Sequence, residues 1–467
     1  MIGLRKIIIV GGGASGVLLA THLIRHRPEG LIVVLIEKRP DLGAGVAYAT
    51  RHPDHLLNVR SANMSAFPDD PGHFTRWLLA RASDCGPDGF APRRLYWDYL
   101  TDLTDPLFLC GQLRRVRGEA VALREDASGV EVLCRNDEDG PQAPVRGDVV
   151  VVATGNEGPS LPPEPWRHAG WGGERDGPPI AADAPVVVVG TGLTMVDRVL
   201  WLLHDRHTGP ITAVSRHGLM PQVHRPGPPA SSFAGREVPF GRPVAPLTRW
   251  LRREAEAAER AGAGWRTAVD GLRPHTQALW GGLPHAERRR FLRHVRPFWD
   301  VHRHRIAPEA AEQLGAAMRS GQLRILAGRV AGFAPHPGGV TVTVTRRGTG
   351  REVVLDAAAV FECRGRAGDV TLSENPFLLS LLRDGQAKPD ALGLGLEVTE
   401  GCALIDAEGR VSDRLYATGP ITAGTFWEIV AVPDIRAQAA SLASALTPAL
   451  GCARAGTARV TGSLSLK

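Results

Sequence analysis

Paired cysteines are missing from this chain. Its 467 residues include six cysteines, and no two of them are spaced as C-x-x-C or C-x-x-x-x-C. Such pairs are typical of structural zinc sites and of redox-active disulfides. The sequence therefore argues against a zinc site, a disulfide framework and a disulfide-reductase centre, and we expect no bound metal. Scattered free cysteines fit a reducing compartment, so we expect a cytoplasmic protein.

Long apolar runs and clusters of positive charge are also missing. Runs such as 149–152 are far too short to span a bilayer, and the first predicted strand begins almost at once, which leaves no room for a signal peptide. The net charge is +6, and lysine occurs at only four positions, so the positive charge comes from scattered arginines. We therefore expect neither a membrane nor a nucleic acid as a partner.

Two glycine-rich loops are the most informative feature that is present. The first, GGGASG at 11–16, follows the apolar run 6–10, and the second, GTGLT at 190–194, follows the apolar run 185–189. Each loop follows a strand-like segment and opens a helix-like one, which is the context of a dinucleotide-binding turn. Two such turns in one chain indicate a flavoprotein in which a nicotinamide cofactor reduces bound FAD.

The first loop has the features of an FAD site. Gly11 permits the tight turn, Gly13 lets the backbone approach a pyrophosphate, and Gly16 lets helix and strand pack closely. Glu37 ends the second strand, 21 residues after Gly16, where a carboxylate binds ribose hydroxyls and repels a 2′-phosphate. The predicted FAD-binding residues are Gly11, Gly13, Ala14, Ser15, Gly16, Glu37, Lys38, Asn58, Ala120, Thr154, Gly155 and Gly419.

The second loop is less regular and favours NADPH over NADH. Met195 stands where glycine or alanine is usual, and the next strand ends in Ser215 and Arg216. An arginine and a serine suit a 2′-phosphate. The alternative is a solvated Arg216 beside a degenerate site, and Arg364, which replaces the threonine of the matching Ala-Thr-Gly, supports it. The predicted NADPH-binding residues are Gly190, Gly192, Leu193, Thr194, Ser215 and Arg216.

A weak internal repeat predicts the domain plan. Segments 113–118, 129–132 and 147–155 recur 210 residues later. We expect an α/β fold with two Rossmann-like domains: an FAD domain from 1–182 and 366–450, and an NAD(P)H domain from 183–365. Within the latter, 225–320 reads as a helical insertion that covers the substrate or only supports folding or dimer contacts. Residues 451–467 read as a flexible tail, and the sequence leaves the oligomeric state open.

Three polar and aromatic segments supply the candidate catalytic residues. They are Asn58 and Met64 in the segment after the first ribose strand, Arg303 and Arg305 in an arginine- and histidine-rich run, and Trp427 after the last glycine strand. The two arginines would suit a carboxylate-bearing substrate. Metal binding by the neighbouring histidines has no standard ligand spacing to support it.

Ordered motifs over most of the chain resemble a known family. They lie at 58–77, 90–100, 190–197, 215–221, 293–308 and 416–438. They resemble the bacterial FAD/NAD(P)-binding proteins of the YdhS type, which are similar to flavin-dependent amine N-oxygenases, including those that convert aspartate toward nitrosuccinate. The resemblance implies FAD, NADPH and O2 chemistry on a small amine. The departure is Glu-Cys-Arg-Gly at 362–365, where Asn-Cys-Thr-Gly is expected.

The favoured hypothesis is a single-component flavin monooxygenase that uses NADPH and O2 to N-oxygenate a small amine or amino acid. One alternative is an NAD(P)H-dependent FAD reductase or dehydrogenase without oxygen transfer. The other is a cofactor-bound scaffold without turnover. A closed site that excludes water is required only by the first hypothesis.

Overall fold

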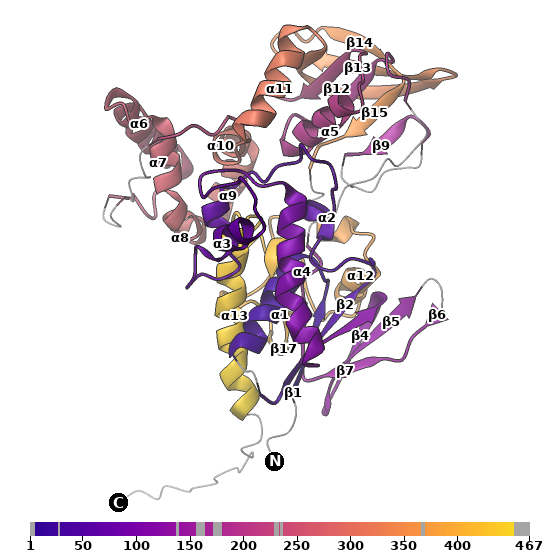
Figure 1. Ribbon diagram of the computed structural model, residues 1–467, viewed down its shortest axis with the longest axis vertical. Coiled ribbons are helices and arrows are strands. Elements are labelled where there is room, and N and C mark those ends of the chain that lie inside the picture. The colour runs from indigo at the N-terminus through magenta and orange to yellow at the C-terminus, as the bar shows by residue number, and fades with distance from the viewer. Residues whose placement is uncertain are drawn as a thin grey trace, which may run out of the picture.

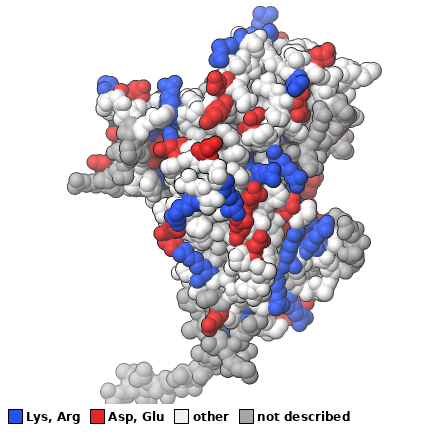
Figure 2. Space-filling model, in the orientation of Figure 1, with Lys and Arg blue, Asp and Glu red and all other residues white. Residues whose placement is uncertain are grey.

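The computed structural model describes residues 5–26, 29–136, 140–155, 164–170, 180–227, 233, 237–365 and 369–452. Figure 1 shows two sheet-containing parts, one below the other, and a group of helices, α6 to α10, set to one side. Basic and acidic side chains are interspersed on the face that Figure 2 shows. No described helix has the length and apolarity that crossing a membrane would require.

The first sheet has the strand order β16-β17-β8-β1-β2-β3. β1 pairs in parallel with β2 and β8, and β17 pairs in parallel with β8. Strands β1, β2 and β8 are largely buried on both faces, which explains their apolar sequences. The bounds are β1 (Arg5–Val10), β2 (Leu31–Glu37), β3 (Leu113–Arg117), β8 (Val149–Val152), β16 (Ala403–Ile405) and β17 (Val411–Ala417).

Each face of the first sheet has its own core. Ile7 and Ile9 of β1 pack with the helices on one face, while Ile8 and Val10 pack with α12 and a small antiparallel sheet on the other. The helices of the first face are α1 (Ala14–His26), α3 (His73–Ala80), α4 (Arg93–Leu109) and α13 (Val432–Cys452). The other face holds α12 (Pro376–Arg383), β4 (Glu119–Asp126), β5 (Gly129–Asn136), β6 (Gly140–Pro141) and β7 (Val145–Gly147).

The second sheet has the order β14-β13-β12-β11-β10-β15-β9 and repeats the plan of the first. β5 and β13 begin 210 residues apart, as the repeat predicts. Helices α5 (Leu193–His204) and α11 (Pro308–Arg319) pack on this sheet. Its strands are β9 (Arg167–Ala169), β10 (Val186–Val189), β11 (Ile211–Ser215), β12 (Leu323–His336), β13 (Gly339–Arg346), β14 (Glu352–Ala357) and β15 (Ala359–Glu362).

The separate helical group has a small core of its own around Val269, Leu272 and Trp299. It comprises α6 (Val244–Arg260), α7 (Trp265–Gly271), α8 (Thr276–Gly282), α9 (His285–Arg290), a π-helical turn (Phe291–Val295) and α10 (Arg296–Arg303). α11, which the sequence places in the insertion, packs instead in the core of the second sheet. The α/β class with two Rossmann-like sheets is confirmed, while most of residues 156–182 and the predicted tail from 453 onward lie outside the described residues.

Candidate cofactor and active site

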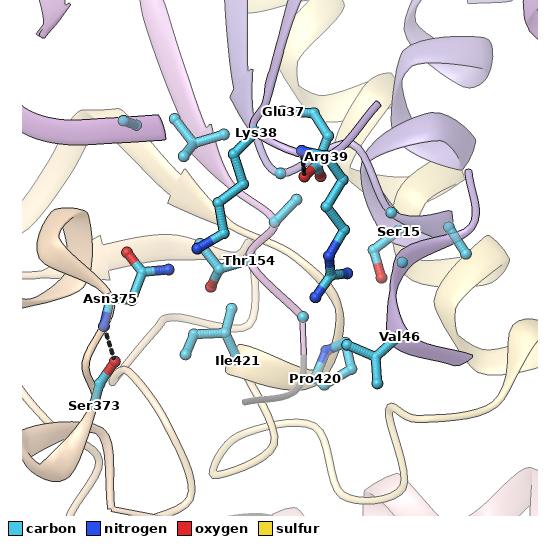
Figure 3. Close-up of a pocket in the computed structure, with 18 of the residues that line it drawn as sticks. Ser15, Glu37, Lys38, Arg39, Val46, Thr154, Ser373, Asn375, Pro420 and Ile421 are labelled. Carbon is cyan, nitrogen blue, oxygen red and sulfur yellow. Dashed lines mark hydrogen bonds between the residues drawn. The ribbon is translucent and has the colours of Figure 1, made fainter. Parts of the chain in front are cut away.

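A first cavity of about 390 Å³ lies where β1, β2 and β8 end and α1 begins. This edge of an α/β sheet is where ligands bind, and the free N–H groups of a helix start favour phosphate. Figure 3 shows side chains from several distant segments around one space. They include Ser15, Glu37, Lys38, Arg39, Val46, Thr154, Ser373, Asn375, Pro420 and Ile421.

The glycines of the first loop divide into two kinds. Gly11 has φ +109°, and a Cβ there would overlap the carbonyl oxygen of Ala153, while a Cβ on Gly16 would overlap the carbonyl oxygen of Gly11. A Cβ on Gly13 would meet only Gly45, whose Cα would lie 3.5 Å away. The fold therefore requires glycine at 11 and 16, whereas Gly13 keeps space open in the cavity wall, where a pyrophosphate would fit.

Glu37 lies at the end of β2, in the wall of the first cavity. Its Oε2 accepts a 2.8 Å hydrogen bond from the backbone N–H of Gly12, and its Oε1 accepts one of 2.9 Å from the N–H of Arg39. These donors fix the carboxylate, and each oxygen keeps a further lone pair for a ribose hydroxyl. Lys38 Nζ lies 2.9 Å from Glu119 Oε1. Lys38 and Ala120, both predicted to bind FAD, line the first cavity.

Thr154 indicates that the first cavity suits a polar ligand. Its hydroxyl oxygen is buried in the cavity wall and has no hydrogen-bond partner among the described residues. A buried hydroxyl without a partner is unfavourable, so such a group calls for a ligand or water. Together with the open space at Gly13 and the fixed Glu37, it fits a dinucleotide such as FAD.

Most, but not all, of the predicted FAD residues line the first cavity. Gly16 lies behind the loop, and Asn58 lies in another cavity. Gly419 donates its N–H to Gln438 Oε1 at 2.7 Å and packs against Ser15, and its neighbours Pro420 and Ile421 form the wall instead. The residues that do line it are Gly11, Gly13, Ala14, Ser15, Glu37, Lys38, Ala120, Thr154 and Gly155.

A second cavity, of about 950 Å³, lies between the two sheets and helix α10. It shares four wall residues with the first cavity: Val46, Ala47 and Tyr48 of α2 (Gly45–Tyr48), and Val430. A group that extends out of the first cavity and a group that lies in the second would therefore meet at this shared wall.

The second glycine loop lines the second cavity and repeats the geometry of the first. Gly190 has φ +115°, and a Cβ there would overlap the carbonyl oxygen of Cys363, whereas a Cβ on Gly192 would meet nothing within 4 Å. Met195 is fully buried in the core beneath α5, so the unusual third position of the motif is explained by packing. Leu193 and Thr194 line the cavity with the two glycines.

Ser215 ends β11 and Arg216 follows it, at the edge of the second cavity. Ser215 Oγ lies 2.8 Å from Thr191 Oγ1 and accepts a 3.1 Å hydrogen bond from the N–H of Gly218, so the loop fixes its position. The Arg216 side chain is exposed, and its guanidinium has no ion pair within the described part of the chain. Arg329 lines the same cavity from β12.

Arg364 is itself exposed, and it forms an ion pair with a carboxylate that is buried. The carboxylate of Glu362 is inaccessible to solvent and is bound by both Arg167 and Arg364, with Oε1–Nη2 distances of 2.5 and 2.9 Å. Arg364 Nε adds a 2.8 Å bond to Glu362 Oε2. The two departures from the expected Asn-Cys-Thr-Gly are therefore coupled: glutamate replaces asparagine, and arginine replaces threonine to pair with it.

Arg364→Thr should lower the free energy of unfolding by about 1–2 kcal/mol, because a buried carboxylate loses one charged partner while Arg167 remains. Urea unfolding measures the change. Arg25→Ala is the matched control, since Arg25 pairs with Asp69 at an exposed site, where ion pairs contribute little. Equal losses in the two variants would show that Glu362 does not depend on Arg364.

Three of the five catalytic candidates line the second cavity. They are Asn58, Met64 and Trp427. Trp427 is stacked on Trp280 of α8, with ring centroids 4.6 Å apart. The carbonyl oxygen of Asn58 lies 3.1 Å from His224 Nε2.

Arg303 and Arg305 do not line either cavity, because acidic residues hold them elsewhere. Arg303 Nε donates to Glu428 Oε2 at 3.2 Å, and Arg305 is paired with Asp270. The opposite side of the same segment faces the cavity and presents Arg296, Asp300 and His304, which are spaced four residues apart. The segment therefore borders the predicted site, but with different side chains.

Contacts from the helical group hold the cavity wall at 424–434. Trp280 Nε1 donates to the carbonyl oxygen of Gly424 at 2.8 Å, and Arg273 Nη2 pairs with Asp434 Oδ2 at 2.9 Å. Glu428 has φ +65°, an unfavourable conformation for a residue with a side chain, and its buried carboxylate accepts hydrogen bonds from Trp299 and Arg303. Through these contacts and α10, the helical group forms part of the wall of the second cavity.

Burial changes the ionisation of one group on α10 and of one residue directly after it. It lowers the pKa of His304 to about 4 and raises the pKa of Asp300. His304 is therefore a neutral ring near pH 7, which can donate or accept a hydrogen bond without bringing positive charge.

Two further features of the cavity walls differ in how far the sequence predicts them. Asn375 caps α12 by accepting from the N–H groups of Phe377 and Leu378, and the Asn-Pro pair at 375–376 is a readable helix start. By contrast, Arg93 of α4 and Asp197 of α5 form a two-bond ion pair of 2.8 and 2.9 Å across the second cavity wall. No spacing rule connects residues so far apart in the chain.

Comparison with known proteins supports the assignment of the first half. Residues 8–157 match a family model described as FAD-NAD(P)-binding. One protein of Mycobacterium bovis and one of Mycobacterium tuberculosis, whose names assign no function, are each 26% identical over 288 residues. These alignments cover 57% of this chain and 51% of each relative, so the chain spans about half the length of the curated relatives it matches.

Solved structures share the fold over almost the whole chain. An ornithine hydroxylase from Pseudomonas aeruginosa has a TM-score of 0.64 at 15% identity, covering 96% of this chain and 100% of that one. A cadaverine monooxygenase from Erwinia amylovora, bound to FAD, has a TM-score of 0.66 at 12% identity over 95% of this chain and 94% of that one. A bacillithiol disulfide reductase from Bacillus cereus has a TM-score of 0.55 at 14% identity, covering 95% and 99%. The chain thus has the fold of two-dinucleotide flavoproteins.

Proposed function

We propose that this chain is a single-component flavin monooxygenase that binds FAD in the first cavity and NADPH in the second and N-oxygenates a small amine or amino acid. The observation that carries the proposal is the shared wall of Val46, Ala47, Tyr48 and Val430, where the two cavities meet. The overall reaction is R–NH2 + O2 + NADPH + H+ → R–NHOH + NADP+ + H2O. The fold shared with ornithine and cadaverine oxygenases supports this choice.

The residues that would hold each cofactor come from the two loops. The FAD phosphates would lie against Gly13 and the start of α1, with a ribose on Glu37 and a polar contact to Thr154. NADPH would lie against Gly192, with its 2′-phosphate on Arg216. Bound flavin would supply the hydride acceptor and the centre that reacts with O2. The division into an FAD domain and an NAD(P)H domain, like the cytoplasmic location, stays a prediction.

The substrate would occupy the end of the second cavity between Asn58, Trp427 and α10. The stacked Trp280 and Trp427 close this end with apolar surface, which helps to exclude water. Arg296 would offer a partner for a substrate carboxylate, and Asp300 would offer one for an ammonium group. Each of these contacts would replace part of the ion pair that Arg296 Nε and Asp300 Oδ2 form with each other at 3.2 Å. The nearness to YdhS-type proteins and nitrosuccinate-forming enzymes rests on the sequence motifs alone.

Arg296→Ala should raise KM for a carboxylate-bearing amine by at least about 10-fold, since it removes a charge-assisted contact. It should also raise the share of NADPH that ends as hydrogen peroxide, because a poorly held substrate leaves the site open to water. Steady-state kinetics and a peroxide assay measure both effects. Arg305→Ala is the control, because that side chain is held by Asp270 away from the cavity. Equal effects in both variants would contradict the assignment of Arg296.

The proposed function is tested by NADPH oxidation with purified FAD-loaded protein over a panel of amino acids and amines. We expect one substrate class to stimulate oxidation, with hydroxylamine formed and little peroxide released. Stimulation by an electron acceptor other than O2, without oxygenated product, would establish a reductase instead. If the bound FAD is reduced neither by a nicotinamide cofactor nor by any member of the panel, the protein is a cofactor-bound scaffold.

A further inference from the structure

Three side chains of types that bind metals meet where the loop after α2 contacts the end of α5. His52 and Asp54 lie in the loop after α2, and His204 is the last residue of α5. One nitrogen or oxygen atom from each lies within 4.8 Å of the others. Sequence spacing could not show this group, because His204 lies 150 residues after Asp54 in the chain.

The distances approach those of a shared ion. His204 Nδ1 lies 3.4 Å from Asp54 Oδ2, and two ligands of one tetrahedral zinc, each about 2.0–2.1 Å from the ion, are about 3.4 Å apart. The rings of His52 and His204 meet edge to face, with centroids 4.5 Å apart. Small side-chain rotations would bring all three atoms to ligand distance.

His52 has a ring nitrogen available for such a role. Its Nε2 is buried and has no hydrogen-bond partner among the described residues. Its Nδ1 accepts a 3.2 Å hydrogen bond from the backbone N–H of Asp54. Ligation through Nε2 would move the ring proton to Nδ1 and give up that long hydrogen bond, in exchange for a metal–nitrogen bond.

We propose that His52, Asp54 and His204 form a binding site for a divalent transition-metal ion of the zinc class. Two imidazoles and one carboxylate are ligands that zinc accepts, and the partly exposed position leaves a fourth place for water. The site is distinct from the cofactor cavities, since none of the three side chains lines either one.

The ion would connect the loop after α2 to α5 beside the second cavity. His55 in this loop stacks on His52, with ring centroids 4.4 Å apart, and its Nε2 lies 2.9 Å from the carbonyl oxygen of Asp197. His55 also lines the second cavity. The bound ion would therefore stiffen the contact between this loop and α5 and would lie outside the two cofactor cavities.

The test is zinc binding to the whole protein, purified without a histidine tag and stripped of metal by a chelator. Calorimetric titration should show one tight equivalent of Zn²⁺, and Co²⁺ should give a tetrahedral visible spectrum. His52→Ala, His204→Ala and Asp54→Asn should each weaken binding by at least about 10-fold. Zn²⁺ should raise the midpoint of thermal unfolding of the unmodified chain but not of these three variants.

His336→Ala is the matched control. His336 forms an exposed pair with Asp356, at 2.7 Å, and belongs to no three-residue cluster within the described chain. Its loss should leave zinc binding unchanged. Circular dichroism of the metal-free variants shows that each one folds. Absence of a stoichiometric zinc equivalent, or unchanged binding in all three site variants, would overturn the proposal, and neither result depends on flavin chemistry.

Discussion

Gly13→Val should abolish FAD binding while leaving the fold intact. The side chain at this position would fill the space in the first cavity where the pyrophosphate is expected, yet a Cβ there meets only Gly45 at an ordinary contact distance. The purified unmodified protein should be yellow and release FAD on denaturation, whereas the variant should be colourless. Absorbance at the flavin band, together with circular dichroism, measures cofactor and fold separately.

The two glycine loops provide a crossed control for this prediction. Gly192 occupies the corresponding place in the second loop, and a Cβ there meets nothing within 4 Å. Gly192→Val should therefore keep FAD and lose reduction by NADPH. Gly11→Ala is unsuitable, because its Cβ would overlap the backbone of Ala153 and disturb the fold itself. A Gly13→Val protein that still binds FAD would refute the assignment of the first cavity.

The features that sequence predicts well are those set by local geometry. Gly11 and Gly190 both have positive φ, and both pack against the residue that follows the neighbouring parallel strand, Ala153 after β8 and Cys363 after β15. A turn of this kind needs glycine whatever surrounds it, so the pattern alone locates both loops. The unbroken apolar runs likewise locate strands that are buried on both faces.

The features that sequence misses depend on which side of a helix faces inward. The run 299–305 draws attention to Arg303 and Arg305, but Arg303, at the end of α10, turns toward Glu428, and Arg305, after the helix, turns toward Asp270. Arg296, one turn earlier along the helix than Asp300, reaches the cavity instead. The rotation of α10 is set by Trp299, which is buried against the core of the helical group, and by its bond to Glu428. No single-sequence pattern contains that tertiary contact.

The coupled replacement at 362–364 shows the same limit in another form. From sequence, Arg364 in place of threonine counts against a working second site. In the fold it neutralises Glu362, a carboxylate that the sequence gives no reason to place in the interior. Charge compensation between strand and loop residues becomes visible only when their contact distances are known.

Arg216→Ala should weaken reduction by NADPH by about 10- to 100-fold and leave reduction by NADH nearly unchanged. A charge-assisted contact is worth about 1.5–3 kcal/mol, and only NADPH has the 2′-phosphate that would make it. Arg216 is suited to this role because it directly follows β11 at the cavity and its guanidinium is free of ion pairs within the described residues. Stopped-flow reduction of bound flavin by each nucleotide measures the ratio.

Arg329→Ala is the control that gives this prediction its specificity. Arg329 lines the same cavity from the neighbouring strand β12 and carries the same charge, so it tests whether general positive potential explains the effect. If Arg216 binds the 2′-phosphate, only Arg216→Ala should change the ratio of the flavin reduction rates with NADPH and NADH. The change should become smaller as the salt concentration rises. Equal losses for both nucleotides in Arg216→Ala, or a selective loss in Arg329→Ala instead, would assign phosphate recognition to a different residue.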